Sequence, residues 1–391
     1  MTATATERRV AAIEDSGWGR SFTFYQPRNA AFWVYLLLVS LGVFSFVTML
    51  VGASGAYGRA IAVSVVLFGV YGALFWGFTQ HIDRYSRQPV GIVVAAFGWG
   101  AFAATWVLAA EANTAALGLF AKVFGQSWSL AWGAGLVAPV TEEIAKGLGL
   151  LLLIALAPRL IRTAFDGFIV GAFLGLGFQI AEDVVYALNS AGSQFGANQV
   201  AAAMGTVWLR MAVGVAAHIL YSAVFCAGLV YLLGRPAEPR RVGRGLVLMA
   251  TAMVLHGVWN SLAALAGGRV VQLVATWVVV IVVALAIAVR VFRMTVPRER
   301  AFLGDVLGPE VAIGTITPEE LIAVCGDHKV RRAFRRMGAD RRDRRRRGHT
   351  LEAVADVADA LATSGGRDTP AVEFARTEVG RIRSGVPSTP R

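Results

Sequence analysis

Residues 136–154 read LVAPVTEEIAKGLGLLLLI, an apolar run long enough for a helix that carries Glu142, Glu143 and Lys146. A charged side chain at the centre of a bilayer costs about 2.5–3.5 kcal/mol on insertion scales, so such residues are rare there and usually functional. Two adjacent carboxylates are harder to accommodate, because like charges resist joint ionisation. This stretch therefore predicts a membrane-spanning helix that contains a functional site.

The composition of the chain supports a membrane location. Of its 391 residues, 56% are hydrophobic and 16% are charged, and the mean hydropathy is +0.59. Ordinary soluble domains carry about 25% charged residues. The net charge of +12 fits a multi-pass membrane protein with Lys and Arg in its cytoplasmic loops. It therefore does not indicate a nucleic-acid partner, and we expect none.

Eight apolar segments are long enough to cross a bilayer, since a transmembrane helix needs about 20 residues. They predict an all-α polytopic membrane helix bundle over 31–293, flanked by an N-terminal tail (1–30) and a C-terminal region (294–391). A weaker amphipathic stretch at 111–128 is expected to lie in the membrane interface. The eight segments are 31–52, 59–79, 90–110, 129–157, 165–188, 201–233, 245–266 and 270–292.

Basic residues are distributed unevenly among the predicted loops. Loops 80–89, 158–164 and 234–244 contain arginines, whereas the intervening loops are almost free of them. The positive-inside rule then places both termini in the cytoplasm, and we expect the plasma membrane. Residues 1–30 are polar, so the sequence gives no sign of a cleavable signal peptide.

The C-terminal region 294–391 is charged and is expected to be cytosolic. Helical spacing of apolar residues predicts helices at 317–337 and 350–363, and the end of the chain, 364–391, reads as disordered. Residues 341–347 contain six arginines and one aspartate. We expect this run to be solvated or to contact anionic membrane lipid, which attracts such clusters.

Few other ionisable groups remain inside the predicted spans. We expect Lys146 and Arg210 to balance the charge of nearby carboxylates. Asn260 lies four residues after His256 on the same helix face, where it would orient the imidazole or hold a water. The remaining polar groups within the spans are Glu182 and Asp183 in the fifth and His218 in the sixth.

The predicted depths of these groups overlap. With a helical rise of about 1.5 Å per residue, Glu142, Glu182, His218 and His256 fall between the middle of the membrane and its outer half. Pro139 suits the first turn of a helix. We therefore also expect the fourth span to break or kink there and leave the two glutamates near a helix N-terminus.

These residues carry a resemblance to a known family. Residues 142–146, Glu-Glu-Ile-Ala-Lys, resemble the Glu-Glu-x-x-Lys motif of PrsW-type intramembrane proteases, which are related to the type II CAAX prenyl endopeptidases. The glycine-rich stretch 166–182, His218 and the segment 256–260 resemble the later motifs of that family. The resemblance covers roughly 130–265 and keeps the motif order.

The resemblance implies a peptidase that cuts single-pass membrane proteins near the outer face of the bilayer. The best-known role in the family is site-1 cleavage of an anti-sigma factor. Asp183 departs from the pattern, because relatives usually have Asn after the glutamate. An extra carboxylate would raise the local negative charge.

Glutamates and histidines within a membrane suit water activation, by a carboxylate base alone or with a bound metal. We expect Glu142 or Glu143 to act as the base. Zn2+ is compatible with such ligands, and Glu143, Glu182, His218 and His256 are the candidate ligands if a metal is bound; otherwise no cofactor is expected. The full set of candidate catalytic residues is Glu142, Glu143, Glu182, His218, His256 and Asn260.

Two other functions remain open. A proton-coupled transporter would show inverted repeats and a polar path that reaches both faces. A non-catalytic scaffold would use the polar cluster to bind a partner helix, and its glutamates would then be replaceable by glutamine.

Overall fold

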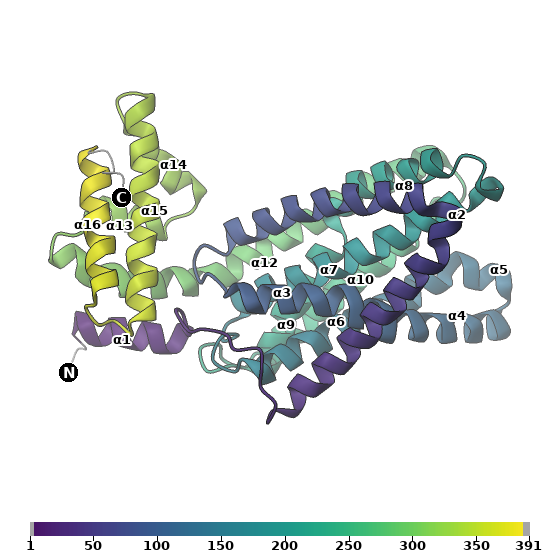
Figure 1. Cartoon of the computed structure of the whole chain (residues 1–391), viewed down its shortest axis with the longest axis horizontal. Helices are drawn as coiled ribbons and strands as arrows, with labels where there is room; N and C mark the ends of the chain where they lie inside the picture. Colours follow the sequence, from purple (N-terminus) through teal and green to yellow (C-terminus); the bar gives the residue numbers. More distant parts are fainter. Residues whose placement is uncertain (1–3, 386–391) are drawn as a thin grey trace. The chain divides into compact units, whose positions relative to one another are not determined.

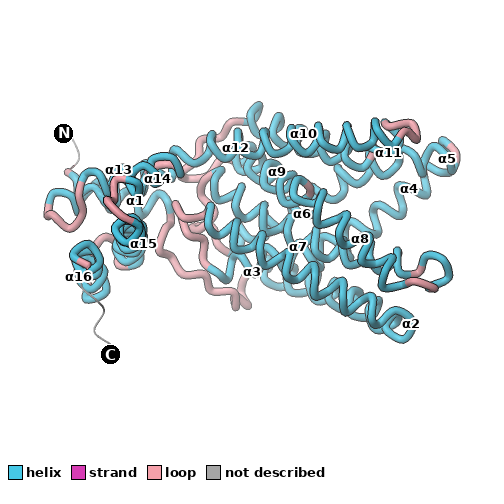
Figure 2. Tube along the Cα trace, turned by 90° about the horizontal axis from the view of Figure 1, so that it is seen from above, coloured by secondary structure: helices cyan, strands magenta, loops and turns pink. Residues whose placement is uncertain are grey.

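The computed structural model describes residues 4–385 as an assembly of helices, with a single isolated bridge between Arg235 and Glu238 (Figures 1 and 2). The predicted all-α polytopic fold is confirmed. The chain divides into two compact units. We call Phe22–Asp83 with Gln88–Met294 the membrane unit. The other, the terminal unit, comprises the described residues up to Ser21, Arg84–Arg87 and the chain from Thr295 onward.

The helices correspond well to the eight predicted segments. Tyr57 leaves the helical region within α2 (Ala30–Ile82), at φ −124° and ψ 20°, so α2 consists of two arms (Figure 1). The fourth segment is α6 (Ala134–Leu156). It contains three charged residues near its middle and is therefore not counted among the apolar spans given next. Among residues 4–385, six helices or runs of consecutive helical segments are long and apolar enough to cross a membrane: Ala30–Ile82, Val90–Phe124, Ala164–Ala191, Gln199–Leu233, Val242–Asn260 and Val270–Ala312.

Some predicted boundaries are wrong. The third span does not end at residue 110, and 111–128 is not a separate amphipathic segment. Instead α3 (Val90–Gly98), the π-helix η1 (Trp99–Ala109) and α4 (Ala110–Phe124) follow one another without interruption. The glycines inside this run keep helical geometry, and the run ends at Gly125, which takes a positive φ of 88°.

The sixth predicted segment is interrupted in its middle. It consists of α8 (Gln199–Val213), a short 3-10 turn η4 (Gly214–Ala216) and α9 (His218–Leu233). Ala217, at φ −109° and ψ −134°, separates the turn from α9. His218 is therefore the first residue of a helix and not part of a continuous span.

The expected break at Pro139 is also wrong. α6 begins at Ala134, directly after the π-helical segment η2 (Ser129–Gly133), and continues through Pro139. The hydroxyl of Thr141 contacts the side-chain oxygen of Asn113 and lies 3.1 Å from the carbonyl of Val137 within α6, the second contact being one that Thr makes in helix interiors. The seventh segment is α10 (Val242–Asn260) with a short α11 (Leu262–Leu265), and the eighth is α12 (Val270–Ala312).

α7 (Ala164–Ala191) lies at the centre of the membrane unit and is buried along most of its length. Its glycines allow α9 to pack directly against its backbone. A Cβ on Gly171 would lie 2.4 Å from the carbonyl oxygen of Ser222, and one on Gly175 would lie 2.2 Å from that of His218. Small residues permit such close helix packing in membranes. The glycine-rich stretch thus holds the start of α9 against α7.

The terminal unit contains α1 (Ala5–Ser16) and four further helices, α13 (Pro318–Cys325), α14 (His328–Arg336), α15 (Arg341–Thr363) and α16 (Pro370–Ser384). The predicted helix at 317–337 is split, because the side chain of Asp327 caps a new helix by accepting from the backbone of Lys329 and Val330.

Disorder over 364–391 is wrong for the residues that form α16. Thr369 caps this helix, Pro370 occupies its first turn, and Val372, Ala375 and Val379 are buried on one face. Residues 386–391 lie outside the described part of the chain.

Candidate active site in the membrane unit

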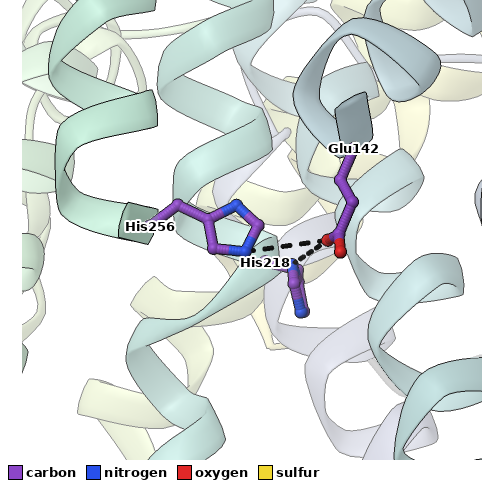
Figure 3. Close-up of side chains that lie close together, drawn as sticks. All are labelled: Glu142, His218 and His256. Atoms are coloured by element: carbon purple, nitrogen blue, oxygen red, sulfur yellow. Dashed lines mark ion pairs between the residues drawn. The ribbon is translucent and has the colours of Figure 1, made fainter. Parts of the chain in front are cut away.

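Acids and imidazoles from four helices meet inside the membrane unit. α6 provides Glu142 and Glu143, α7 provides Glu182, α9 begins with His218, and α10 provides His256 near its C-terminal end. Figure 3 shows Glu142 with both imidazoles directed toward its carboxylate. The structure thus brings together five of the six candidate catalytic residues.

His256 is held between the two glutamates of α6. Its Nδ1 lies 3.2 Å from Oε1 of Glu143 and its Nε2 lies 3.6 Å from Oε2 of Glu142. A proton on Nδ1, directed to Glu143, leaves the Nε2 lone pair facing Glu142. That Nε2 atom is buried and has no hydrogen-bond partner among the described residues.

His218 pairs with Glu182 of α7 in the same way that His256 pairs with Glu143. Its Nε2 lies 3.0 Å from Oε2 of Glu182, and its Nδ1 lies 3.8 Å from Oε2 of Glu142. A proton on Nε2, directed to Glu182, leaves the Nδ1 lone pair facing the centre. Each imidazole therefore contacts a different carboxylate with one nitrogen and turns the other nitrogen toward Glu142.

Lys146 balances the charge of the cluster, as predicted. Its side chain is fully buried, and its Nζ lies 2.8 Å from Oε1 of Glu143 and 3.8 Å from Oε2 of Glu142. The same ammonium lies 3.1 Å from Nδ1 of His218 and 4.0 Å from the ring centroid of Phe178. Buried charges are tolerated when they are paired in this way.

Glu142 has one engaged oxygen and one free oxygen. Asn113, in α4, donates to Oε1 at 3.1 Å, whereas Oε2 is buried without a hydrogen-bond partner among the described residues. Sequence reasoning missed Asn113, because the stretch 111–128 was assigned to the interface. In the sequence, the polar amide of Asn113 is the one feature that could have identified it as a site residue.

Arg210 of α8 is a counter-ion, as predicted. Its Nη2 lies 2.6 Å from Oε2 of Glu182, its Nε donates to Asp183, and its guanidinium lies 4.4 Å from the ring centroid of Tyr186. Asp183 is fully buried. The carboxylate of Asp183 is therefore paired with a cation rather than directed at the imidazoles.

Two further residues of α9 complete the surroundings and were missed from the sequence. Ser222 donates its hydroxyl to Oε2 of Glu143 at 3.0 Å. The ring of Tyr221 stacks on His256, with centroids 5.3 Å apart and an interplanar angle of 19°. Both residues lie three or four positions after His218, so helical periodicity puts them on the same face.

Asn260 does not take the place expected for it. Its side chain makes no hydrogen bond to the described residues, and Glu143 occupies Nδ1 of His256 instead. α10 ends at Asn260, so the asparagine lies at the last position of the helix. The orientation of the imidazole comes from Glu143.

The cluster fits a metal ion. Ligand atoms of Glu142, His218 and His256 lie within 4.8 Å of one another, and two of them, Oε2 of Glu142 and Nε2 of His256, are buried without a hydrogen-bond partner among the described residues. Tetrahedral zinc with bonds of about 2.0–2.2 Å places its ligand atoms about 3.3–3.6 Å apart. The Lys146 ammonium occupies part of this space, so a metal requires it to turn toward Glu143.

The group that could hold an ion, Glu142, His218 and His256, differs from the expected ligand set of Glu143, Glu182, His218 and His256. In the structure Glu143 and Glu182 each contact the outer nitrogen of an imidazole. Carboxylates in that outer position orient metal-binding histidines and fix their protonation.

Comparison with known proteins agrees with the motifs and the geometry. The model of the PrsW family of intramembrane metalloproteases matches residues 88–287, about half of the chain, including every residue of the cluster. No curated protein and no solved structure matches the chain. The chain belongs to the PrsW family of intramembrane proteases.

Proposed function

We propose that this membrane protease hydrolyses a peptide bond of a single-pass membrane-protein substrate at the centre shared by Glu142, His218 and His256. The observation that carries the proposal is the pairing of each imidazole with its own carboxylate, Glu143 for His256 and Glu182 for His218. This pairing leaves three acceptor atoms facing one another in a buried space: Oε2 of Glu142, Nδ1 of His218 and Nε2 of His256. Lys146 supplies a cation to the first two, at 3.8 Å and 3.1 Å. Nε2 of His256 is left without a hydrogen-bond partner among the described residues.

The residues of the chain divide the chemistry among them. The free oxygen of Glu142 is the group that accepts a proton from an attacking water when no metal is bound. Glu143 and Glu182 hold the imidazoles, and Ser222 and Lys146 hold Glu143. In the absence of a metal, the ammonium of Lys146 is the positive group closest to an oxyanion that forms here.

We favour a metalloprotease over a purely glutamic enzyme. Glu142, His218 and His256 would hold the ion. A bound Zn2+ lowers the pKa of its water and polarises the substrate carbonyl. The two unpartnered buried atoms, Oε2 of Glu142 and Nε2 of His256, support this assignment, because buried polar atoms are normally satisfied.

Positions along the helices support cleavage near the outer side of the plasma membrane, with both termini cytoplasmic. Glu142 lies in the first half of α6, Glu182 in the second half of α7, and His256 near the end of α10. If these helices alternate in direction, all three lie toward the side whose loops have few basic residues. An anti-sigma factor is the substrate we propose by family resemblance.

A cleavage assay tests the proposal. The full-length chain, reconstituted in liposomes with a tagged single-pass substrate, is compared with Glu142→Gln and His256→Ala. Glu111→Gln is the matched control, because Glu111 is an exposed carboxylate of α4 outside the cluster. We expect cleavage to fall about a thousandfold or more in both site variants and to persist in the control.

Cleavage that persists in both site variants at normal protein levels would defeat the assignment. Metal analysis of the detergent-purified protein separates the two mechanisms. A metalloprotease loses bound zinc and activity together in His218→Ala, whereas a glutamic enzyme keeps full activity after treatment with a chelator.

A further inference from the structure

The arginine run of the terminal unit is divided by helical geometry into two groups. Arg346 and Arg347 pair with Asp343 of the same helix, at 2.6 Å and 3.6 Å. Arg341, Arg344 and Arg345 point to a different face of α15. The run that reads as one block in sequence is therefore not one patch on the surface.

The second group joins arginines of α14 in a groove of about 720 Å3. α14 and α15 lie side by side (Figure 1), joined by a tight turn in which a Cβ on Gly338 would lie 2.7 Å from the backbone nitrogen of Arg344. Buried Phe334 is covered by the guanidinium of Arg347 at 5.3 Å. The groove is lined by Arg332, Arg335, Arg336, Arg341, Arg344, Arg345, Gly348, His349 and Glu352.

The positive charge of this groove is not neutralised by the protein. Within residues 4–385 none of its six arginines forms an ion pair, and its single acid, Glu352, lies 3.3 Å from Nδ1 of His349. The Nε of Arg344 donates to the carbonyl of Gly338 at 3.2 Å, which fixes one guanidinium at the groove wall. Like charges gathered in a concave surface raise the local potential and attract anions.

We propose that this groove binds a ligand with clustered phosphate oxygens. The planar guanidinium matches pairs of phosphate oxygens through two parallel hydrogen bonds, and six guanidiniums offer several such pairs. No Phe, Tyr or Trp lines the groove, so it lacks the large aromatic surfaces on which single-stranded nucleic acids usually stack. The proposal is independent of the protease function, since every residue involved belongs to the terminal unit.

Two sources supply this chemistry, a free phosphate compound and the headgroup of an anionic lipid. The lipid source has one advantage, because α12 (Val270–Ala312) carries the chain from the membrane unit into the terminal unit. The experiment distinguishes the sources. Full-length protein in a neutral detergent is titrated with inorganic pyrophosphate, with short-chain phosphatidylglycerol, and with phosphatidylcholine of the same tails.

The test variant is Arg332→Gln/Arg336→Gln/Arg345→Gln, which removes three charges from the groove. The matched control, Arg20→Gln/Arg342→Gln/Arg367→Gln, removes three exposed charges of the terminal unit outside it. We expect affinity for pyrophosphate or for phosphatidylglycerol to fall at least about tenfold in the test variant, because contacts to phosphate are lost. The salt dependence of binding should fall as well. The control should bind as the unmodified chain does.

Binding of pyrophosphate identifies a soluble ligand, and binding of phosphatidylglycerol without pyrophosphate identifies a lipid headgroup; either result supports the proposal. Equal losses in the two variants would show only a general effect of net charge and overturn it. Binding of neither anionic probe would also overturn it.

Discussion

The membrane unit and the terminal unit each contain a cluster of like charges. In the membrane unit these charges are paired with opposite charges, whereas in the terminal unit, among the described residues, they are not. In the membrane unit Glu142, Glu143 and Glu182 are surrounded by Lys146, Arg210 and two imidazoles, and most of their oxygens have a partner. In the arginine groove the six guanidiniums form no ion pair within residues 4–385 and are exposed. Burial explains the difference, because an isolated charge is far costlier in a dry interior than in water.

The comparison also identifies which atoms are available for chemistry. In a cluster where almost every charge is paired, the few atoms without partners are informative. Oε2 of Glu142 and Nε2 of His256 are such atoms. In an exposed groove a missing partner within the chain means only that an external anion is free to enter.

The largest effect should come from breaking the buried pair of Glu143 and Lys146. Glu143→Ala leaves a fully buried ammonium without its closest counter-charge, which should destabilise the protein by about 3–5 kcal/mol and abolish cleavage. Thermal unfolding in detergent measures the first effect. Adding Lys146→Met should restore much of the stability without restoring activity. A Glu143→Ala protein as stable as the unmodified chain would contradict the pairing.

The second-largest effect on cleavage should come from replacing Arg210. Arg210→Gln removes the cation from Glu182 and Asp183, so the acid that holds His218 loses its own support. Loss of such an outer contact typically costs about 10–100-fold in activity or metal affinity. Asp183→Asn in the same protein should recover part of the loss, because it removes the carboxylate left unpaired. Cleavage rates of the single and double variants decide this, and full activity in Arg210→Gln would contradict the proposed support.

Two variants of Tyr221 distinguish a packing role of its ring from a hydrogen-bonding role of its hydroxyl. Tyr221→Phe keeps the ring stacked on His256 and removes a buried hydroxyl that has no partner among the described residues. Its stability should be unchanged or raised by up to about 1 kcal/mol. Tyr221→Leu loses the flat ring and should reduce cleavage about tenfold. If Tyr221→Phe lowers cleavage as much as Tyr221→Leu, the hydroxyl takes part in the reaction.

The smallest effect should come from the exposed pairs of the terminal unit. Hydrogen bonds from Arg346 and from the backbone of Ala339 lower the pKa of Asp343 below its ordinary value. Its stabilising contribution is therefore present above the unfolded pKa, about 3.9, and is lost as the pH falls through the lower folded pKa. Asp343→Asn should change the unfolding temperature only slightly near neutral pH. A large change would show that exposed pairs matter more than expected.

The sequence was sufficient for the all-helical, multi-pass character of the fold and for most residues of the cluster, although it predicted eight spans where six candidate spans are found among the described residues. Long apolar runs and motif spacing are local properties, so 165–188 was predicted almost as α7 is found. The partition of roles between Glu142 and Glu143 was beyond the sequence, because adjacent residues of one helix point about 100° apart. Only the packing of α10 and α4 decides which of the two meets the free imidazole nitrogen.

The missed elements depend on tertiary contacts. Asn113 lies in a stretch that continues a membrane helix, and its role arises only because α4 passes beside α6. The break before His218 follows from Gly214 and Ala217, and neither residue is a strong break signal on its own. α16 was missed because its composition is polar, although Thr369 and Pro370 form a regular helix start.

The most direct test of a single shared centre is the energetic coupling between Glu142 and His256. Cleavage rates are measured for Glu142→Asp, for His256→Gln and for the double variant, all of which should retain a measurable rate. Residues that act as one unit give strongly non-additive losses. We therefore expect the double variant to be little slower than the slower single variant. Losses that multiply would mean that the two side chains act independently, and would contradict a common centre.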